Sequence, residues 1–225
     1  MERSPAMPMR ARLESEINRV HTGILQMGTH AEEALHMAMQ ALSTDNLELA
    51  QNILLNDKKI DRMQAEIDDL VMQIIAMEQP VASDLRGLIA GIKIVAEIER
   101  IGDHARHIAS TTAKISREAL EPLLPRITAM NNTGISMLHD AMTAFMNTDD
   151  QMAETIARRD DKIDELYDLS YQEILSLMQS STKRIPDGAI LLMVCRYLER
   201  LGDHVTNICE WVVYAGRCEH IELNE

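Results

Sequence analysis

Residues 99–104 read Glu-Arg-Ile-Gly-Asp-His, and residues 199–204 read Glu-Arg-Leu-Gly-Asp-His. Only the third position differs, with Ile in one copy and Leu in the other. Repetition at this distance indicates a duplicated structural unit. Each copy places a Glu and an Asp four residues apart, so on a helix both carboxylates lie on one face. The doubled motif therefore predicts two pseudo-symmetric halves, each carrying an acidic pair.

The composition favours helices throughout. Hydrophobic residues make up 46% of the 225 residues and aromatic residues only 3%, while Gly (9) and Pro (6) are scarce. Leu, Ile, Met and Ala form helices well, and so few turn residues leave little punctuation for short strands. A stripe with helical spacing runs through Ile60, Met63, Ile67, Leu70, Ile74 and Met77. We therefore expect an all-α fold of two pseudo-symmetric antiparallel three-helix bundles.

The best boundary between the two halves is the stretch at residues 121–125, Glu-Pro-Leu-Leu-Pro. It predicts a first bundle over residues 10–120 and a second over 121–225, after a disordered N-terminus at 1–9. Thr44 or Asp45 is expected to cap the second helix. The six long helices are expected at about 9–41, around 60–77, from 82 or 83 to before 121, at 125–146, around 156–177 and around 191–212.

Charge and hydropathy exclude some classes of partner. The net charge of −14 and the lack of a basic stripe argue against nucleic acid and against adsorption to an anionic membrane. No stretch approaches 18 uninterrupted apolar residues, so we expect a protein that is not membrane-inserted. The three cysteines form no CxxC pair, and Cys195 lies in an apolar helical stretch, where we expect it to be buried. These features fit the reducing cytoplasm.

Further acids lie level with the motif acids when each half folds as a helical hairpin. The matched pairs are Asp57–Asp103 and Asp61–Glu99 about Pro80, and Asp160–Asp203 and Asp164–Glu199 about the turn at residues 181–182. The motif acids follow the apolar stripe by one residue, about 100° of rotation, so they lie on its flank rather than in the core. Because the two helices of a hairpin have the same rotational offset, their acidic flanks either both face the groove between the helices or both face away from it.

Four carboxylates in one groove would raise one another's pKa, and a bound divalent cation would relieve that cost. Oxygen ligands suit Mg, Ca, Mn or Fe, and a nearby imidazole makes Fe or Zn more plausible. His104 and His204 either reach into the sites or face solvent, while His107 and Asn207 extend each acidic ladder. Gly102 and Gly202 indicate close helix packing or access to the site, because mid-helix Gly costs about 1 kcal/mol relative to Ala. The alternative without a metal is that these acids form a solvent-exposed helix face and make surface salt bridges with Arg100 and Arg200.

Both motif copies resemble the PhoU family, the accessory and regulatory proteins of phosphate transport, and so do residues 79–86 and 196–198. The resemblance covers about residues 10–215 and implies six helices in two bundles, with multinuclear metal sites at E(D)xxxD motifs. Two departures from the family pattern, His107 in place of Asn and Ala65 opposite Asp168, imply that the two sites differ. Carried over, the ligands of Fe, Mn, Mg or Zn are Asp57, Asp61, Glu99, Asp103, Asp160, Asp164, Glu199 and Asp203, with Asp168 a less certain addition.

The resemblance also implies a function. A family member would exert negative control over the phosphate starvation response by linking an ABC phosphate transporter to a sensor histidine kinase. It would act without catalysis, as a homodimer or a higher oligomer. The residues leave two alternatives, a metalloenzyme (ferritin-like or a phosphohydrolase) and a purely structural helical scaffold. A di-iron bundle would project Glu-x-x-His pairs into its core, whereas here Glu-x-x-x-Asp pairs flank it.

Overall fold

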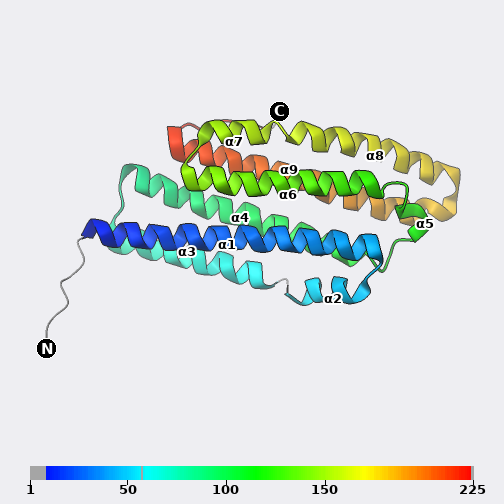
Figure 1. Cartoon of the computed structure of the whole chain (residues 1–225), viewed down its shortest axis with the longest axis horizontal. Helices are drawn as coiled ribbons and strands as arrows, with labels where there is room; N and C mark the ends of the chain where they lie inside the picture. Colours follow the sequence, from blue (N-terminus) through cyan, green and yellow to red (C-terminus); the bar gives the residue numbers. More distant parts are fainter. Residues whose placement is uncertain (1–8, 57, 224–225) are drawn as a thin grey trace.

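The structure, a computed structural model, describes residues 9–56 and 58–223, and within them it is helical without strands. Most of the N-terminal segment expected to be disordered lies outside these residues. Figure 1 shows the chain order. The first half contains α1 (Met9–Thr44), α2 (Leu47–Asn56), α3 (Lys58–Glu78) and α4 (Ala82–Thr111). After a short α5 (Arg117–Leu120), the second half contains α6 (Leu124–Asn147), α7 (Asp150–Ala157), α8 (Asp160–Ser180), a 3-10 turn (Thr182–Arg184) and α9 (Ile185–Arg217).

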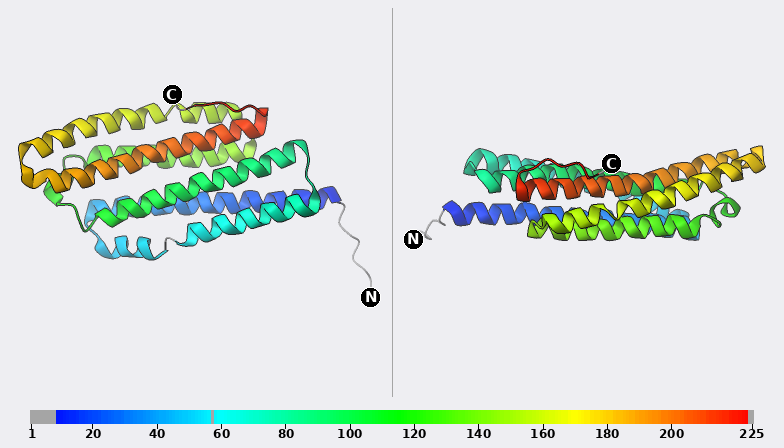
Figure 2. Two further views of the ribbon diagram at one scale, coloured as in Figure 1. Left: turned by 180° about the vertical axis from the view of Figure 1, so that it is seen from behind. Right: turned by 90° about the horizontal axis from the view of Figure 1, so that it is seen from above.

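The two halves repeat one plan and share their inner helices. In the first half α1 packs on α3 and α4, and in the second α9 packs on α6 and α8. Across the halves α4 packs on α9 and α1 on α6, so α1, α4, α6 and α9 form a four-helix centre. The long helices run along the long axis of a flat molecule, with α3 and α8 at opposite sides (Figure 2). The all-α, two-repeat architecture expected from the duplication is therefore confirmed.

The outer helix of each half is broken into a short and a long piece. Asn46 caps α2, accepting a hydrogen bond from the amide of Leu49 at 3.0 Å, so Thr44 and Asp45 are not the caps. Asp149 accepts the equivalent bond from the amide of Met152 at 2.9 Å at the start of α7. Such caps satisfy backbone donors that a helix start leaves unpaired. The two outer helices therefore start in the same way, although their sequences differ.

The third predicted helix ends earlier than expected, at Thr111. The hydroxyl of Thr111 donates to the carbonyl of Ile108, an alternative to continuing the helix that Thr side chains offer. The connection then bonds to the second half, because the amide and hydroxyl of Ser116 donate to Asp187 at 3.0 and 2.6 Å. The segment between the bundles is thus attached to the start of α9.

The core follows most of the predicted stripe. Ile60, Ile67 and Ile74 are buried, whereas Met77, in the last turn of α3, is 67% exposed. Cys195 is buried as expected, and its thiol is free. Of the helices described, none is long and apolar enough to cross a membrane.

Candidate metal centres

The predicted site residues lie on the two long helical hairpins. Glu99 and Asp103 lie on α4 and Asp61 near the start of α3; Asp57 lies outside the described residues. In the second half Glu199 and Asp203 lie on α9 and Asp160 and Asp164 on α8. The four motif acids are half-buried, as expected for the flank of the apolar stripe.

The motif glycines allow each outer helix to approach closely. A Cβ built on Gly102 would lie 2.7 Å from Cδ1 of Ile60, and one on Gly202 would lie 3.1 Å from Cδ1 of Ile163. These contacts place the start of α3 against the motif of α4, and the start of α8 against the motif of α9. Close packing thus accounts for the two mid-helix glycines.

Asp160 departs from the flank position of the motif acids. Its side chain is buried, with 6% of the residue exposed, and its Oδ1 has no hydrogen-bond partner among the described residues. Thr206 donates to its Oδ2 at 3.4 Å. A Cβ on Gly202 would lie only 1.8 Å from Oδ1, so the carboxylate occupies space that only Gly leaves open. Burial, followed by repulsion from Asp164 and Asp203, raises the pKa of Asp160 to about 7.

The other second-half acids form one cluster with Asp160. Burial raises the pKa of Asp164, and the charges of Asp203, Asp161 and Asp168 add to this rise. Burial and the charge of Asp203 likewise raise the pKa of Glu199, against the opposing charge of Arg196, which pairs with it. In this half, therefore, the acids of α8 lie near enough to those of α9 for their charges to interact.

In the first half, two arginines lie beside the motif acids of α4. Arg106 donates to Oδ1 of Asp103 at 2.9 Å, and Nε of Arg100 lies 3.6 Å from Oε2 of Glu99. Position 206, which matches Arg106 in the second copy of the motif, is Thr. The two halves thus differ in the side chain that follows the motif on α4 and on α9.

The second-half cluster suits a hard cation chemically. Oδ1 of Asp160 and Oε2 of Glu199 are buried with no hydrogen-bond partner in the part of the chain that the structure describes, and neighbouring carboxylates raise one another's pKa. A divalent cation would give the buried oxygens a ligand and would reduce the repulsion between the carboxylates. As the described side chains stand, however, no three His, Cys, Asp or Glu residues surround one point closely enough to hold an ion. Ligation would therefore require side-chain rotation within the cluster.

The histidines of the motif lie between the two halves. His104 and His204 are each 8% exposed, with ring centroids 5.1 Å apart. Nδ1 of His204 lies 2.6 Å from Oε2 of Glu97, which also accepts from Asn207 at 3.2 Å. Burial and then the charge of His204 lower the pKa of His104 to about 3. The motif histidines are therefore buried between α4 and α9 and do not face solvent.

The sequence analysis did not identify Glu97 and Tyr197 as members of this buried group. His107 stacks on Tyr197, with ring centroids 5.0 Å apart and 15° between planes. Asn207 donates a hydrogen bond to Glu97. Glu97 and Tyr197 hold the same position in the two copies, two residues before the motif Glu. Their shared position next to the motif was the feature of the sequence that could have indicated a role for both residues.

The geometry defines a class of protein: a duplicated helical bundle with an acidic motif on one helix of each half. The sequence matches the PhoU domain family over residues 24–112 and again over residues 127–212. The chain belongs to this family.

Relatives and solved structures agree with this assignment. The chain is 36% identical over 213 residues to the phosphate-specific transport system accessory protein PhoU homolog of Clostridium acetobutylicum, covering 94% of this chain and 97% of the relative. It is 34% identical to PhoU of Escherichia coli, covering 89% and 83%. The crystal structure of the phosphate transport system regulatory protein PhoU from Streptococcus pneumoniae matches with a TM-score of 0.87 at 30% identity, covering 93% and 99%. PhoU from Pseudomonas aeruginosa matches with a TM-score of 0.84 at 30% identity, covering 92% and 99%.

Proposed function

We propose that this chain is a metal-binding accessory protein of phosphate-specific transport that restrains phosphate uptake. In this proposal it links an ABC phosphate transporter to a sensor histidine kinase and exerts negative control over the phosphate starvation response. The observation that carries the metal-binding part is the second-half cluster, in which Asp160, Asp164 and Glu199 all have raised pKa values. Family membership and the names of the relatives support the transport part.

The proposed ligands are those of the sequence analysis, with a divalent or trivalent Fe, Mn, Mg or Zn ion. In the second half Asp160, Asp164, Glu199 and Asp203 would hold it, supplying oxygen ligands of the kind that hard cations prefer. A bound cation would neutralise the cluster and fix the start of α8 against α9. Asp61, Glu99 and Asp103, with Asp57, would form the first-half site.

Elemental analysis of purified protein tests metal binding. We expect wild-type protein incubated with Fe, Mn, Mg or Zn to retain metal. Glu199→Gln/Asp203→Asn should lose the second-half share and Glu99→Gln/Asp103→Asn the first-half share. Glu66→Gln/Asp69→Asn, which changes the charge equally at exposed positions of α3, is the matched control.

Metal retained equally by all four proteins would contradict the assignment of ligands. Metal absent from every form would leave the acidic motif as a packing and partner-binding feature.

Phosphate uptake in cells tests the regulatory role. Deletion of the gene should raise uptake and the expression of phosphate starvation genes in phosphate-rich medium, and wild-type protein should restore repression. Uptake that is unchanged by the deletion would refute the role. We propose a cytoplasmic location and a homodimer or higher oligomer for this regulator, and sedimentation of the purified chain tests the latter.

A further inference from the structure

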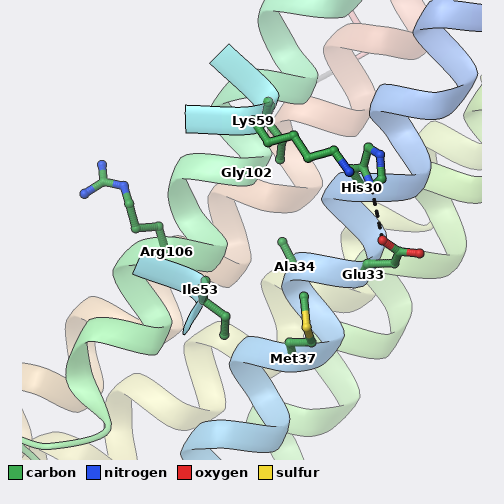
Figure 3. A pocket seen from close by; sticks show the side chains of 9 residues that line it. His30, Glu33, Ala34, Met37, Ile53, Lys59, Gly102 and Arg106 are labelled. Atoms are coloured by element: carbon green, nitrogen blue, oxygen red, sulfur yellow. Dashed lines mark hydrogen bonds and ion pairs between the residues drawn. The ribbon is translucent and has the colours of Figure 1, made fainter. Parts of the chain in front are cut away.

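A cavity of about 300 Å³ opens between α1, α3 and α4 beside the last turns of α2 (Figure 3). Its volume lies at the lower end of the range of about 300–1,000 Å³ that is typical of ligand pockets. The apolar part of the lining consists of Ala34, Met37, Ile53 and Ile60, together with Gly102. The polar part consists of His30, Glu33, Lys59 and Arg106.

The charge of this lining is opposite to that of the whole chain. Lys59 and Arg106 against Glu33 leave a formal excess of one positive charge with His30 neutral, whereas the chain carries −14. Each positive group comes from a different element, Lys59 from α3 and Arg106 from α4. Because Arg106 pairs with Asp103, the ammonium of Lys59 is the positive charge that this lining offers, and it favours an anionic occupant.

Most polar groups of the lining already have partners. Nδ1 of His30 lies 3.1 Å from Oε2 of Glu33, and Arg106 donates to Asp103. Lys59 makes no ion pair or hydrogen bond with the described residues. In Figure 3 its side chain extends toward His30, whereas the guanidinium of Arg106 points away from both. Lys59 is thus the cation available to a ligand.

The apolar part of the cavity sets the second requirement for a ligand. Met37 is a flexible side chain that adapts to different shapes, and Ile53 and Ile60 give the cavity a branched aliphatic wall. A bare inorganic anion would meet Lys59 but leave this apolar wall uncovered. An occupant with both an acid group and a short aliphatic part would satisfy both regions of the lining.

We propose that this cavity binds a small organic anion, a carboxylate or a phosphate monoester, through Lys59. The acid group would pair with the ammonium of Lys59, and the aliphatic part would contact Met37, Ile53 and Ile60. The carboxylate and the phosphate monoester share this chemistry, so the test includes one probe of each. The proposal is argued from the lining of the cavity and not from metal binding, although the cavity borders the α4 motif at Gly102 and Arg106.

Titration of the full-length chain, labelled with ¹³C at its methionine methyl groups, tests the proposal. The probes are hexanoate and n-butyl phosphate, with 1-hexanol and inorganic phosphate as controls for the tail and the head alone. We expect saturable shifts of the Met37 methyl signal with at least one organic anion, and weaker or no binding with both controls. The stronger of the two organic anions identifies the source of the acid group.

Variants separate charge from shape. Lys59→Gln should weaken binding by at least about tenfold, because one pairing with a charged group is lost. Lys59→Arg should retain most of the affinity. The matched control is Lys58→Gln, which removes the neighbouring exposed charge outside the cavity and should leave binding unchanged. Ala34→Leu should abolish binding by filling the cavity while every charge stays in place.

Three results would overturn the proposal. The first is that neither organic anion shifts Met37 saturably. The second is that Lys58→Gln weakens binding as much as Lys59→Gln, which would indicate attraction to general surface charge. The third is that 1-hexanol binds as tightly as hexanoate, which would make the cavity a purely apolar void.

Discussion

At the residue scale, the position of the Asp160 carboxylate requires a glycine at position 202. The Asp160 carboxylate fills the space beside Gly202, where a Cβ would lie 1.8 Å from Oδ1. Gly102 faces the flexible end of Ile60 instead, at 2.7 Å. The same glycine of the motif therefore admits a carboxylate in one half and an aliphatic side chain in the other.

Substitution of Gly202 tests this dependence. Gly202→Ala should lower the free energy of unfolding by about 1–3 kcal/mol, because the new methyl group displaces Asp160. Gly87→Ala is the control, since a Cβ there meets nothing within 4 Å, and it should stabilise the protein by about 0.5–1 kcal/mol. Urea denaturation measures both values. A Gly202→Ala protein as stable as wild type would refute the close approach.

The buried charge of Asp160 predicts a pH dependence. Its pKa in the folded protein is about 7, above the ordinary value of 3.8, so between these values the folded state holds a proton that the unfolded state releases. Metal-free stability should therefore fall as pH rises from about 4 to 7 and stay low above that. Asp160→Asn removes this loss and should be more stable than wild type at pH 8 by about 2–4 kcal/mol.

Denaturation in EDTA at pH 4.5 and pH 8 measures the difference. The advantage of Asp160→Asn should shrink at the lower pH, where wild-type Asp160 is protonated. Asp161→Asn, at an exposed neighbouring position, should show a smaller change between the two pH values. An advantage of Asp160→Asn that is equal at both pH values would contradict the raised pKa.

At the element scale, α4 and α9 meet through a polar group whose two sides differ. On one side Glu97 of α4 bonds His204 and Asn207 of α9. On the other, Tyr197 of α9 stacks on His107 of α4. Burial raises the pKa of Glu97, but the hydrogen bonds from His204 and Asn207 outweigh it and hold the pKa below its ordinary value. The pairing of α4 with α9 therefore includes a charged hydrogen-bond network as well as apolar packing.

A double-mutant cycle measures that network. Glu97→Ala should lower the free energy of unfolding by about 1–3 kcal/mol, because it leaves the buried ring of His204 without its acceptor. With His204→Ala as the second change, the coupling energy should be about 0.5–3 kcal/mol. Strictly additive effects of the two changes would show that the contact contributes no coupling between α4 and α9.

At the scale of the whole molecule, the two halves share one buried core. Buried residues of α1, α4, α6 and α9 form a single cluster, so separating the halves would expose the apolar faces of four helices. The division at residues 120 and 121 remains a prediction about sequence units. The packing indicates that the two units are stabilised together.

Unfolding followed by two probes tests this cooperation. Trp211 on α9 is the single tryptophan of the chain, so its fluorescence reports on the second half, whereas far-UV circular dichroism reports on all helices. The two curves should coincide in one transition. A two-step dichroism curve in which Trp211 follows only one step would show that the halves unfold independently.

Residue spacing alone predicted much of the architecture. The duplicated motif predicted two repeats, the period of about 3.6 predicted long amphipathic helices, and the step from Ile98 to Glu99 placed the motif acids on the flank. These features depend on which face of one helix a residue occupies, and periodicity determines that directly. The same spacing predicted that Asp160 and Asp164 lie level with the α9 motif.

Only the tertiary structure decided what each face meets. The sequence left open whether the acidic flanks share a groove, and it did not predict that Asp160 is buried against Gly202. Nor did it place His104 and His204 between the halves, or assemble Lys59, Met37 and Ile53 around one cavity. The physical reason is that helical periodicity specifies directions around one helix. Burial, pKa and cavity volume depend on which neighbouring helix packs there and how closely.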